Sequence, residues 1–347
     1  MSGAPSFRTA QTSVSPSKST LSQKDFSFLL RPEIYHPLTL LDVPPPFRVA
    51  SSQPDPSTPL PDLVLTGYFR SAAIKAAQTL TSPGINSSDH VTIFELVYTR
   101  LSCLTLCNQT RLASQEVKAL EDLNSGYYRD DMDGKHLVPW ELRVLAVRLQ
   151  GMGFNDARRG VMGYYDLARD ARLTLTQLKK SRAEKEDVEV EKAIKLWEER
   201  LAELGVRVAS ALIEMEDLEG ASRFLETLKP SATATSDGVL RLELQKALLW
   251  LCLGDVEAAR ACIAGGEADS EKNVILALAH MADSDFEKAA DAWELLITGD
   301  GGEGEKAMWK QNLGVCFLYL GKMDAVSHLS ACVPSHIADI FLDTRNS

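Results

Sequence analysis

The chain has 347 residues, with 37 Lys and Arg against 48 Asp and Glu, and a formal net charge of −11. This excess of carboxylates argues against a nucleic-acid or anionic-membrane surface, because phosphate binding needs clustered Lys and Arg. No run approaches the roughly 20 apolar residues of a membrane span, and the first residues carry no signal-peptide-like apolar segment. We therefore expect a cytoplasmic protein whose six cysteines are reduced thiols.

Residues 1–61 hold eleven of the fifteen prolines, and residues 1–23 are rich in Ser and Thr. Such a composition buries too little apolar surface to offset the entropy of ordering the backbone, so a mostly disordered tail is expected. The part at 25–47 differs, because it contains an apolar cluster typical of a docking segment. It packs either on its own domain or on another subunit. The residues predicted to bind protein in it are Phe26, Phe28, Leu29, Leu30 and Tyr35.

From residue 62 onward the pattern is helical, and the four remaining prolines lie where helices start or stop. Residues 62–178 are predicted to form degenerate N-terminal helical repeats. Gly67 marks a turn before a helix that contains Ala72, and Pro139 opens another helix. Apolar side chains at Phe94, Val97, Leu101 and Leu104 step by three and four residues along one helix face.

Residues 179–343 are predicted to form a block of tetratricopeptide-like repeats, which starts with one helix over about 179–212. The flank from Lys179 to Glu203 carries seven basic and eight acidic residues, which is typical of a solvated helix face. Four hairpins are predicted, each with a small residue in the first helix and a turn that contains Gly or Asp. The small residues are Ala209, Ala247, Ala277 and Gly314, spaced by 38, 30 and 37 residues, near the roughly 34-residue tetratricopeptide period.

Two antiparallel helices approach closely only where their facing side chains are small, which explains this spacing. One hairpin cannot bury its apolar face alone, so neighbouring hairpins stack into a solenoid. The predicted fold is therefore all-α, an α-solenoid of six or seven tetratricopeptide-like hairpins.

Five stretches of the sequence carry a resemblance to a known family, at 137–146, 194–201, 208–212, 217–221 and 311–323. Together they resemble subunit 12 of the transport protein particle (TRAPP) complex, in a short fungal-type form. The resemblance covers roughly residues 62–330 in matching order. It implies an accessory, non-catalytic scaffold subunit of a tethering assembly that supports Rab GTPase activation in ER-to-Golgi transport and autophagy.

The same resemblance implies that the partners are other TRAPP subunits. It also implies that the protein is peripheral at Golgi and ER-derived vesicle membranes through the complex. No catalytic residue is carried over, because nucleotide exchange in that complex belongs to small core subunits. An alternative is another scaffold with the same repeats, such as a co-chaperone, a vesicle-coat subunit or a ubiquitin-ligase subunit.

The chemical motifs favour a non-enzyme. Gly299, Gly301 and Gly304 fit G-x-G-x-x-G, but a helix rather than a strand precedes them, and nearby carboxylates would repel a pyrophosphate. The histidines and cysteines lack zinc or catalytic spacing. We therefore predict no catalytic residue, cofactor, metal site or small-molecule substrate.

The inner positions of the first helices are mostly apolar, which suits a groove for a helix or an extended apolar segment. A co-chaperone groove for an acidic tail would need a basic clamp there, and these positions supply none. The predicted protein-binding residues of the groove are Leu244, Leu248, Leu278 and Val315.

Overall fold

The computed structural model describes residues 24–39, 43, 48, 53–132, 134–153, 157–184, 188–230, 235–265, 270–299 and 301–332. Within these residues the chain is all-helical and has no β-strand. The predicted disordered stretch at 1–23 lies outside the described residues. Nowhere in the described ranges is a helix both long enough and apolar enough to cross a membrane.

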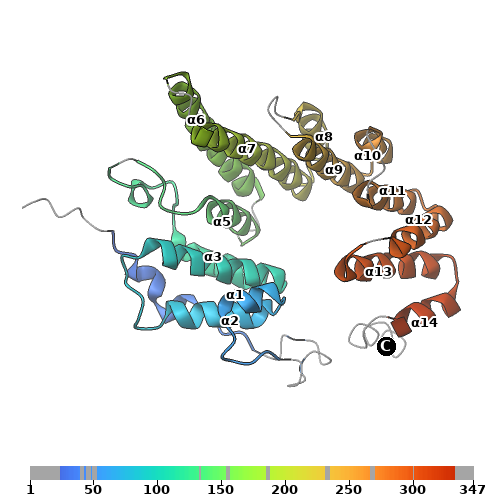
Figure 1. Ribbon diagram of the computed structural model, residues 1–347, viewed down its shortest axis with the longest axis horizontal. Coiled ribbons are helices and arrows are strands. Elements are labelled where there is room, and N and C mark those ends of the chain that lie inside the picture. The colour runs from blue at the N-terminus through green and yellow to red at the C-terminus, as the bar shows by residue number, and fades with distance from the viewer. Residues whose placement is uncertain are drawn as a thin grey trace, which may run out of the picture.

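Fourteen α-helices lie within the described residues, and consecutive helices pack against each other. Figure 1 shows them following one another round an open arc. Taken two at a time, they make seven consecutive pairs. Their bounds are α1 (Leu60–Leu65), α2 (Phe69–Leu80), α3 (His90–Leu106), α4 (Thr110–Glu116), α5 (Trp140–Gly153), α6 (Ala157–Glu184), α7 (Val188–Glu214), α8 (Leu218–Thr227), α9 (Ser236–Leu253), α10 (Val256–Ile263), α11 (Ser270–Ala282), α12 (Phe286–Thr298), α13 (Glu303–Tyr319) and α14 (Met323–Cys332). Short 3₁₀ helices accompany them, including η1 (Ser27–Leu30), η2 (Pro32–Ile34), η6 (Val117–Leu120) and η7 (Gly126–Tyr128).

The hydrophobic core is divided along the array into four successive clusters. The first cluster joins the N-terminal segment to α1–α5, and the second joins α5, α6 and α7. The third extends from α7 to α11, and the fourth from α11 to α14. Each cluster therefore shares a helix with the next, as expected of an array whose units are stabilised mainly by their neighbours.

The turns of the last four pairs lie at the residues that the sequence predicts. In the first three, an aspartate ends the turn: Asp217, Asp255 and Asp285 each accept a hydrogen bond from a backbone N–H in the first turn of the following helix. The left-handed backbone reverses the chain, and the aspartate then satisfies a free N–H of the new helix. The left-handed residues of the four turns are Glu216 (φ 60°), Gly254 (φ 83°), Ser284 (φ 62°) and Gly321 (φ 71°).

Alanines occupy the contact between the two helices of a pair. Ala209, Ala247 and Ala277 in the first helices are completely buried, and so are Ala221, Ala259 and Ala289 in the second helices. Gly314 is the exception, because a Cβ atom added there would meet nothing within 4 Å. The expectation that close packing requires a small residue at Gly314 is therefore wrong, since α13 leaves open space at this position.

Replacing Ala259 by Phe should destabilise the α9–α10 pair. Ala259 is completely buried in the third cluster together with Ala209 and Ala247. An added ring overpacks this contact, so we expect the free energy of unfolding to fall by about 1–3 kcal/mol. Urea unfolding measures the change. Ala261→Phe on the exposed side of α10 is the matched control, with an expected change within about 0.5 kcal/mol.

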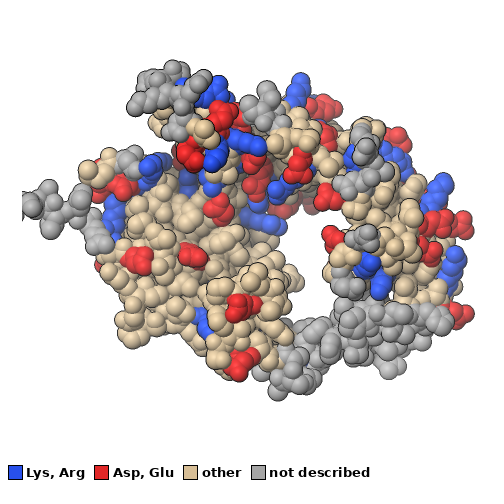
Figure 2. All heavy atoms as spheres, viewed as in Figure 1, with Lys and Arg blue, Asp and Glu red and all other residues tan. Residues whose placement is uncertain are grey.

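The predicted single helix over 179–212 is wrong at its start. Residues up to Glu184 belong to α6, and α7 begins at Val188. The mixed charges of this region join the two antiparallel helices rather than only facing solvent: Lys179 pairs with Glu198 (2.8 Å) and Arg182 with Glu191 (2.9 Å). Figure 2 shows the interleaved charges over these helices. Because both helices are polar and helix-forming, their composition hides the boundary.

His136, in the connection between α4 and α5, is held neutral by its surroundings. Its Nε2 lies 2.9 Å from the carbonyl oxygen of Leu123, and its Nδ1 accepts a hydrogen bond from the Val138 N–H. Burial, reinforced by the nearby charge of Arg143, lowers the pKa of His136 to about 4 from its ordinary 6.5.

Acidification should therefore weaken the fold through His136. Below pH 6.5 the unfolded chain protonates this ring, whereas the folded chain protonates it only when the pH falls to about 4. Stability is therefore lost as the pH falls through this window. We expect His136→Gln to flatten this part of the pH dependence of the urea midpoint. An identical slope in both proteins would contradict the assignment.

Candidate protein-interaction surface

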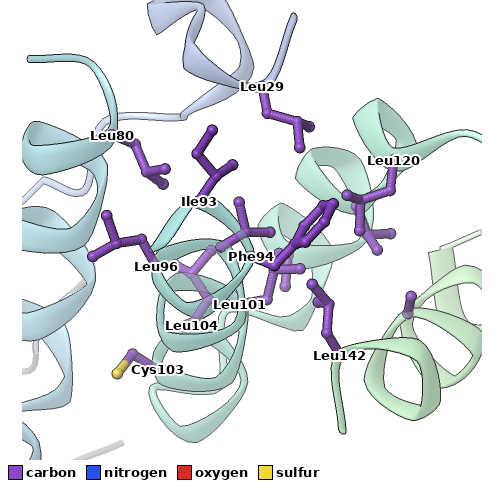
Figure 3. Close-up of a cluster of buried hydrophobic side chains, with 14 of the residues drawn as sticks. Leu29, Leu80, Ile93, Phe94, Leu96, Leu101, Cys103, Leu104, Leu120 and Leu142 are labelled. Atoms are coloured by element: carbon purple, nitrogen blue, oxygen red, sulfur yellow. The ribbon is translucent and has the colours of Figure 1, made fainter. Parts of the chain in front are cut away.

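The N-terminal segment, residues 24–38, packs on the chain's own first helices. Phe26 is completely buried, with its ring centroid 5.0 Å from that of Phe94 and 5.5 Å from that of Tyr127. Leu29 is buried beside it. Figure 3 shows Leu29 close to Ile93 and Phe94 of α3. Of the two alternatives for this segment, the described contacts support packing on its own domain.

The other three predicted docking residues of this segment, Phe28, Leu30 and Tyr35, are partly buried against the same cluster. The Tyr35 hydroxyl donates a hydrogen bond of 2.6 Å to the carbonyl oxygen of Leu29, and burial raises the pKa of Tyr35. All five apolar residues thus contribute to the folded core rather than forming a free motif. The remainder of the predicted segment, 40–42 and 44–47, lies outside the described residues.

A buried ion pair anchors the end of the segment. Arg100 on α3 donates to both carboxylate oxygens of Glu116 on α4, at 3.0 and 2.7 Å. The same guanidinium donates to the carbonyl oxygens of Ala73 (3.0 Å) and His36 (2.7 Å), and Glu116 accepts from the His36 N–H (2.8 Å). The two side chains are only 2% and 1% exposed. We call Arg100, Glu116 and His36 the N-terminal clamp.

The four predicted inner-face residues lie on α9, α11 and α13, which are first helices of successive pairs. Leu244 is buried in the third cluster, and Leu278 and Val315 are half-buried. Only Leu248 is substantially exposed, at 42%. Of these four residues, the chain's own packing buries Leu244 and leaves the other three partly or substantially accessible.

A cleft of about 500 Å³ lies on the first helices nearer the N-terminus. Helices α3, α5, α7 and the start of α9 line it, so it crosses four successive pairs. The sequence-predicted inner positions do not include its residues. Its apolar residues include Tyr98, Trp140, Val144, Leu145, Leu196 and Leu242, and its charged residues are Glu141, Arg148, Lys195, Glu198, Glu199, Arg200, Glu203, Arg207, Asp237 and Arg241.

Several of these charges are already paired within the chain. The Arg200 guanidinium lies 5.4 Å from the ring centroid of Trp140 and 4.9 Å from that of Trp197, and it pairs with Glu141 at 2.9 Å. Arg207 pairs with Glu203 at 2.5 Å. The contacts of Arg200 with Trp140 and Glu141 link α7 to α5, whereas the Arg207–Glu203 pair lies within α7.

No family model matches this chain. None of the curated proteins compared with it is significantly similar either.

The two buried thiols of the described helices, Cys103 and Cys316, are poorly suited to chemistry. Burial raises the pKa of Cys103 to about 11 and also raises the pKa of Cys316. Both are therefore protonated at neutral pH and pack as small apolar side chains. Across the described ranges, no group of three or more His, Cys, Asp or Glu side chains is arranged to hold a metal ion.

Sequence reasoning missed both the clamp and the cleft. The only local signal for the clamp was an arginine, Arg100, on the apolar face of a helix that also carries Val97 and Leu101. For the cleft, the local signal was Trp140 at the start of α5, which lines the cleft and shares Arg200 with Trp197 of α7. Neither signal identifies its partners, because those lie on other helices.

Proposed function

We propose that this chain is a non-catalytic scaffold subunit of a TRAPP-type vesicle-tethering complex. In this role it supports Rab GTPase activation in ER-to-Golgi transport and autophagy without carrying out nucleotide exchange itself. The ordered resemblance over residues 62–330 supports the family. The observation that carries the scaffold role is one continuous array of helix pairs with a cleft across four of its first helices.

We further propose that the last four pairs are tetratricopeptide-like repeats. Two features support this reading. Completely buried alanines occur in both helices of the first three of these pairs, and a left-handed residue followed by a capping aspartate makes each of their turns. In such an array the first helices of the pairs form an inner surface that other proteins contact. Other TRAPP subunits are the proposed partners, and the protein reaches Golgi and ER-derived vesicle membranes through them.

Affinity purification of the tagged full-length chain from cytosol tests the proposal. We expect the TRAPP core subunits to co-elute with it, and to be missing when an untagged chain is processed in parallel. Co-elution with vesicle-coat, ubiquitin-ligase or chaperone components in their place would contradict the TRAPP assignment and support the alternative scaffold role.

A nucleotide-release assay on the Rab GTPase tests the non-catalytic part. The isolated chain should leave the release rate at its spontaneous value, whereas the purified complex should accelerate it. Acceleration by the isolated chain would overturn the assignment as a scaffold.

A further inference from the structure

The solvent-facing side of α6 combines exposed apolar side chains with arginines. One side of this helix is buried against α5 and α7 in the second cluster. On its other side three large apolar side chains remain exposed, namely Met162 (63%), Tyr165 (45%) and Leu173 (58%). Exposed arginines lie among them. We call the following residues the α6 stripe: Arg158, Met162, Tyr165, Arg169, Arg172 and Leu173.

The stripe follows the spacing of a coiled-coil seam. Positions 158, 162, 165, 169 and 172 are separated by alternating steps of four and three residues, which places them in a row along one side of the helix. A second helix laid along this row can insert its own side chains between them. An extended segment would find no free backbone partners there, because the N–H and C=O groups in the interior of α6 are paired within the helix. The stripe therefore suits a helix.

The charges of the stripe are positive and only partly offset. Arg158, Arg169 and Arg172 supply them, and no carboxylate belongs to the stripe. Asp166, at its edge, pairs with Arg169. Within the part of the chain that the structure describes, neither Arg158 nor Arg172 has an ion-pair partner. Two positive charges therefore remain, one toward each end of the exposed apolar group.

Near Arg172 the nearest carboxylate of α6 is already occupied. Asp170 lies two residues before Arg172 and so faces another side of the helix. It pairs there with Arg143 at 2.7 Å and with Arg129 at 3.3 Å. One carboxylate thus serves two other arginines, and it does not offset the charge of Arg172.

Arg158 has a similar setting at the start of α6. It borders a hollow of about 760 Å³ between α5, α6 and α7, whose charged lining residues are Arg148, Arg158, Arg207 and Glu214. Arg207 is occupied by Glu203 at 2.5 Å, which leaves two arginines against one carboxylate in this lining. Both ends of the stripe therefore favour an acidic occupant, because complementary charges select the partner of an interface.

A partner protein suits the stripe better than a membrane or a second copy of this chain. The broad apolar side of α6 is buried in the array, so only the three exposed apolar side chains could enter a bilayer. The net charge of −11 also opposes an anionic membrane. Two copies of the stripe would place arginine against arginine. Tyr, Met and Arg, by contrast, are enriched in protein interfaces.

We propose that the α6 stripe binds an acidic amphipathic helix of a partner protein, which lies along α6. Its apolar side chains pack against Met162, Tyr165 and Leu173, and its carboxylates pair with Arg158 and Arg172. This surface is separate from the cleft, to which α6 contributes no residue. The inference rests on the proposed scaffold role and specifies the chemistry of one partner contact.

Fluorescence anisotropy with the isolated full-length chain tests the inference. The probe is a labelled peptide of about 18 residues, long enough to populate a helix in water, with Leu along one face and Glu beside it. We expect saturable binding that weakens as salt is added. The double variant Arg158→Glu/Arg172→Glu should bind at least about tenfold more weakly, because like charges now face each other. This variant should also gain affinity for the same peptide with Lys in place of Glu.

Two further variants separate the apolar contact from a general effect of charge. Met162→Gln/Leu173→Gln removes two exposed apolar side chains but keeps good helix formers, and it should weaken binding by about fivefold. The control Arg111→Glu/Arg223→Glu makes the same change of charge at exposed positions on α4 and α8 and should bind the Glu peptide like the wild type. Thermal melting of each variant checks that the chain still folds.

Three results would overturn the inference. They are the absence of saturable binding to the wild-type chain, equal binding of the Lys peptide, and equal weakening in the control variant. Phosphatidylserine vesicles that bind through Arg158 and Arg172 where the peptide does not would assign the stripe to a membrane instead. A dimer that Arg158→Glu/Arg172→Glu abolishes would assign it to a second copy.

The outcome also separates this inference from the proposed function. If the peptide binds but no TRAPP subunit co-elutes with the tagged chain, the proposed function fails and the inference about the stripe stands. If TRAPP subunits co-elute but the peptide does not bind, only the inference is rejected.

Discussion

Replacing Glu116 by Gln is expected to lower the free energy of unfolding by about 3–5 kcal/mol, because it leaves the Arg100 guanidinium buried without a counter-charge. The carboxylate also accepts the His36 N–H, so the N-terminal segment should loosen together with the α3–α4 contact. Urea unfolding measures the loss. Limited proteolysis after Lys24 and Arg31 should become faster at the same time.

The matched control makes the same chemical change in an exposed pair. Glu219 and Arg223 on α8 form an ion pair whose side chains are 77% and 75% exposed, and Glu219→Gln should cost no more than about 0.5 kcal/mol. Equal losses in the two variants would mean that the clamp contributes no more than a surface ion pair.

Replacing Phe26 by Ala is expected to cost about 3–5 kcal/mol, the range for removing a completely buried aromatic ring. The ring lies among Phe94, Tyr127 and Tyr128, so its removal leaves a cavity between these three side chains. Thermal and urea unfolding both report this loss.

Phe28→Ala is the control for Phe26→Ala, because Phe28 lies in the short helix η1 that Phe26 immediately precedes, but Phe28 is only partly buried. We expect a clearly smaller loss there. The pair of variants also separates the two alternatives for the segment when assembly is assayed alongside stability. If either variant melts like the wild type but no longer assembles with its partners, docking of the segment on a partner is favoured over packing on its own domain.

The capping aspartates Asp217 and Asp255, followed by small residues such as Ala221 and Ala259, were recognisable in the sequence because capping and close helix contact are local requirements. Each requirement places one type of residue at a fixed distance from the start of a helix, and such a pattern can be read from the sequence. The all-helical class follows from the same patterns.

The boundary between α6 and α7 could not be found in this way. Polar, helix-forming residues continue through it, so no change of composition marks the end of one helix. At Gly314 the sequence pattern predicted a close contact that the structure does not contain. A glycine at the expected position indicated a close contact, and only the packing of α13 shows that the space beside it is open.

The sequence by itself therefore determined the fold class, the turns and the buried alanines of the last pairs. The tertiary structure alone decided the N-terminal clamp and the cleft. Glu116 follows Arg100 by 16 residues, and the His36 carbonyl that Arg100 binds precedes it by 64. The cleft likewise takes its residues from four helices. No local pattern links such residues, because the order in which helices stack, rather than the spacing of residues along the chain, brings them within bonding distance.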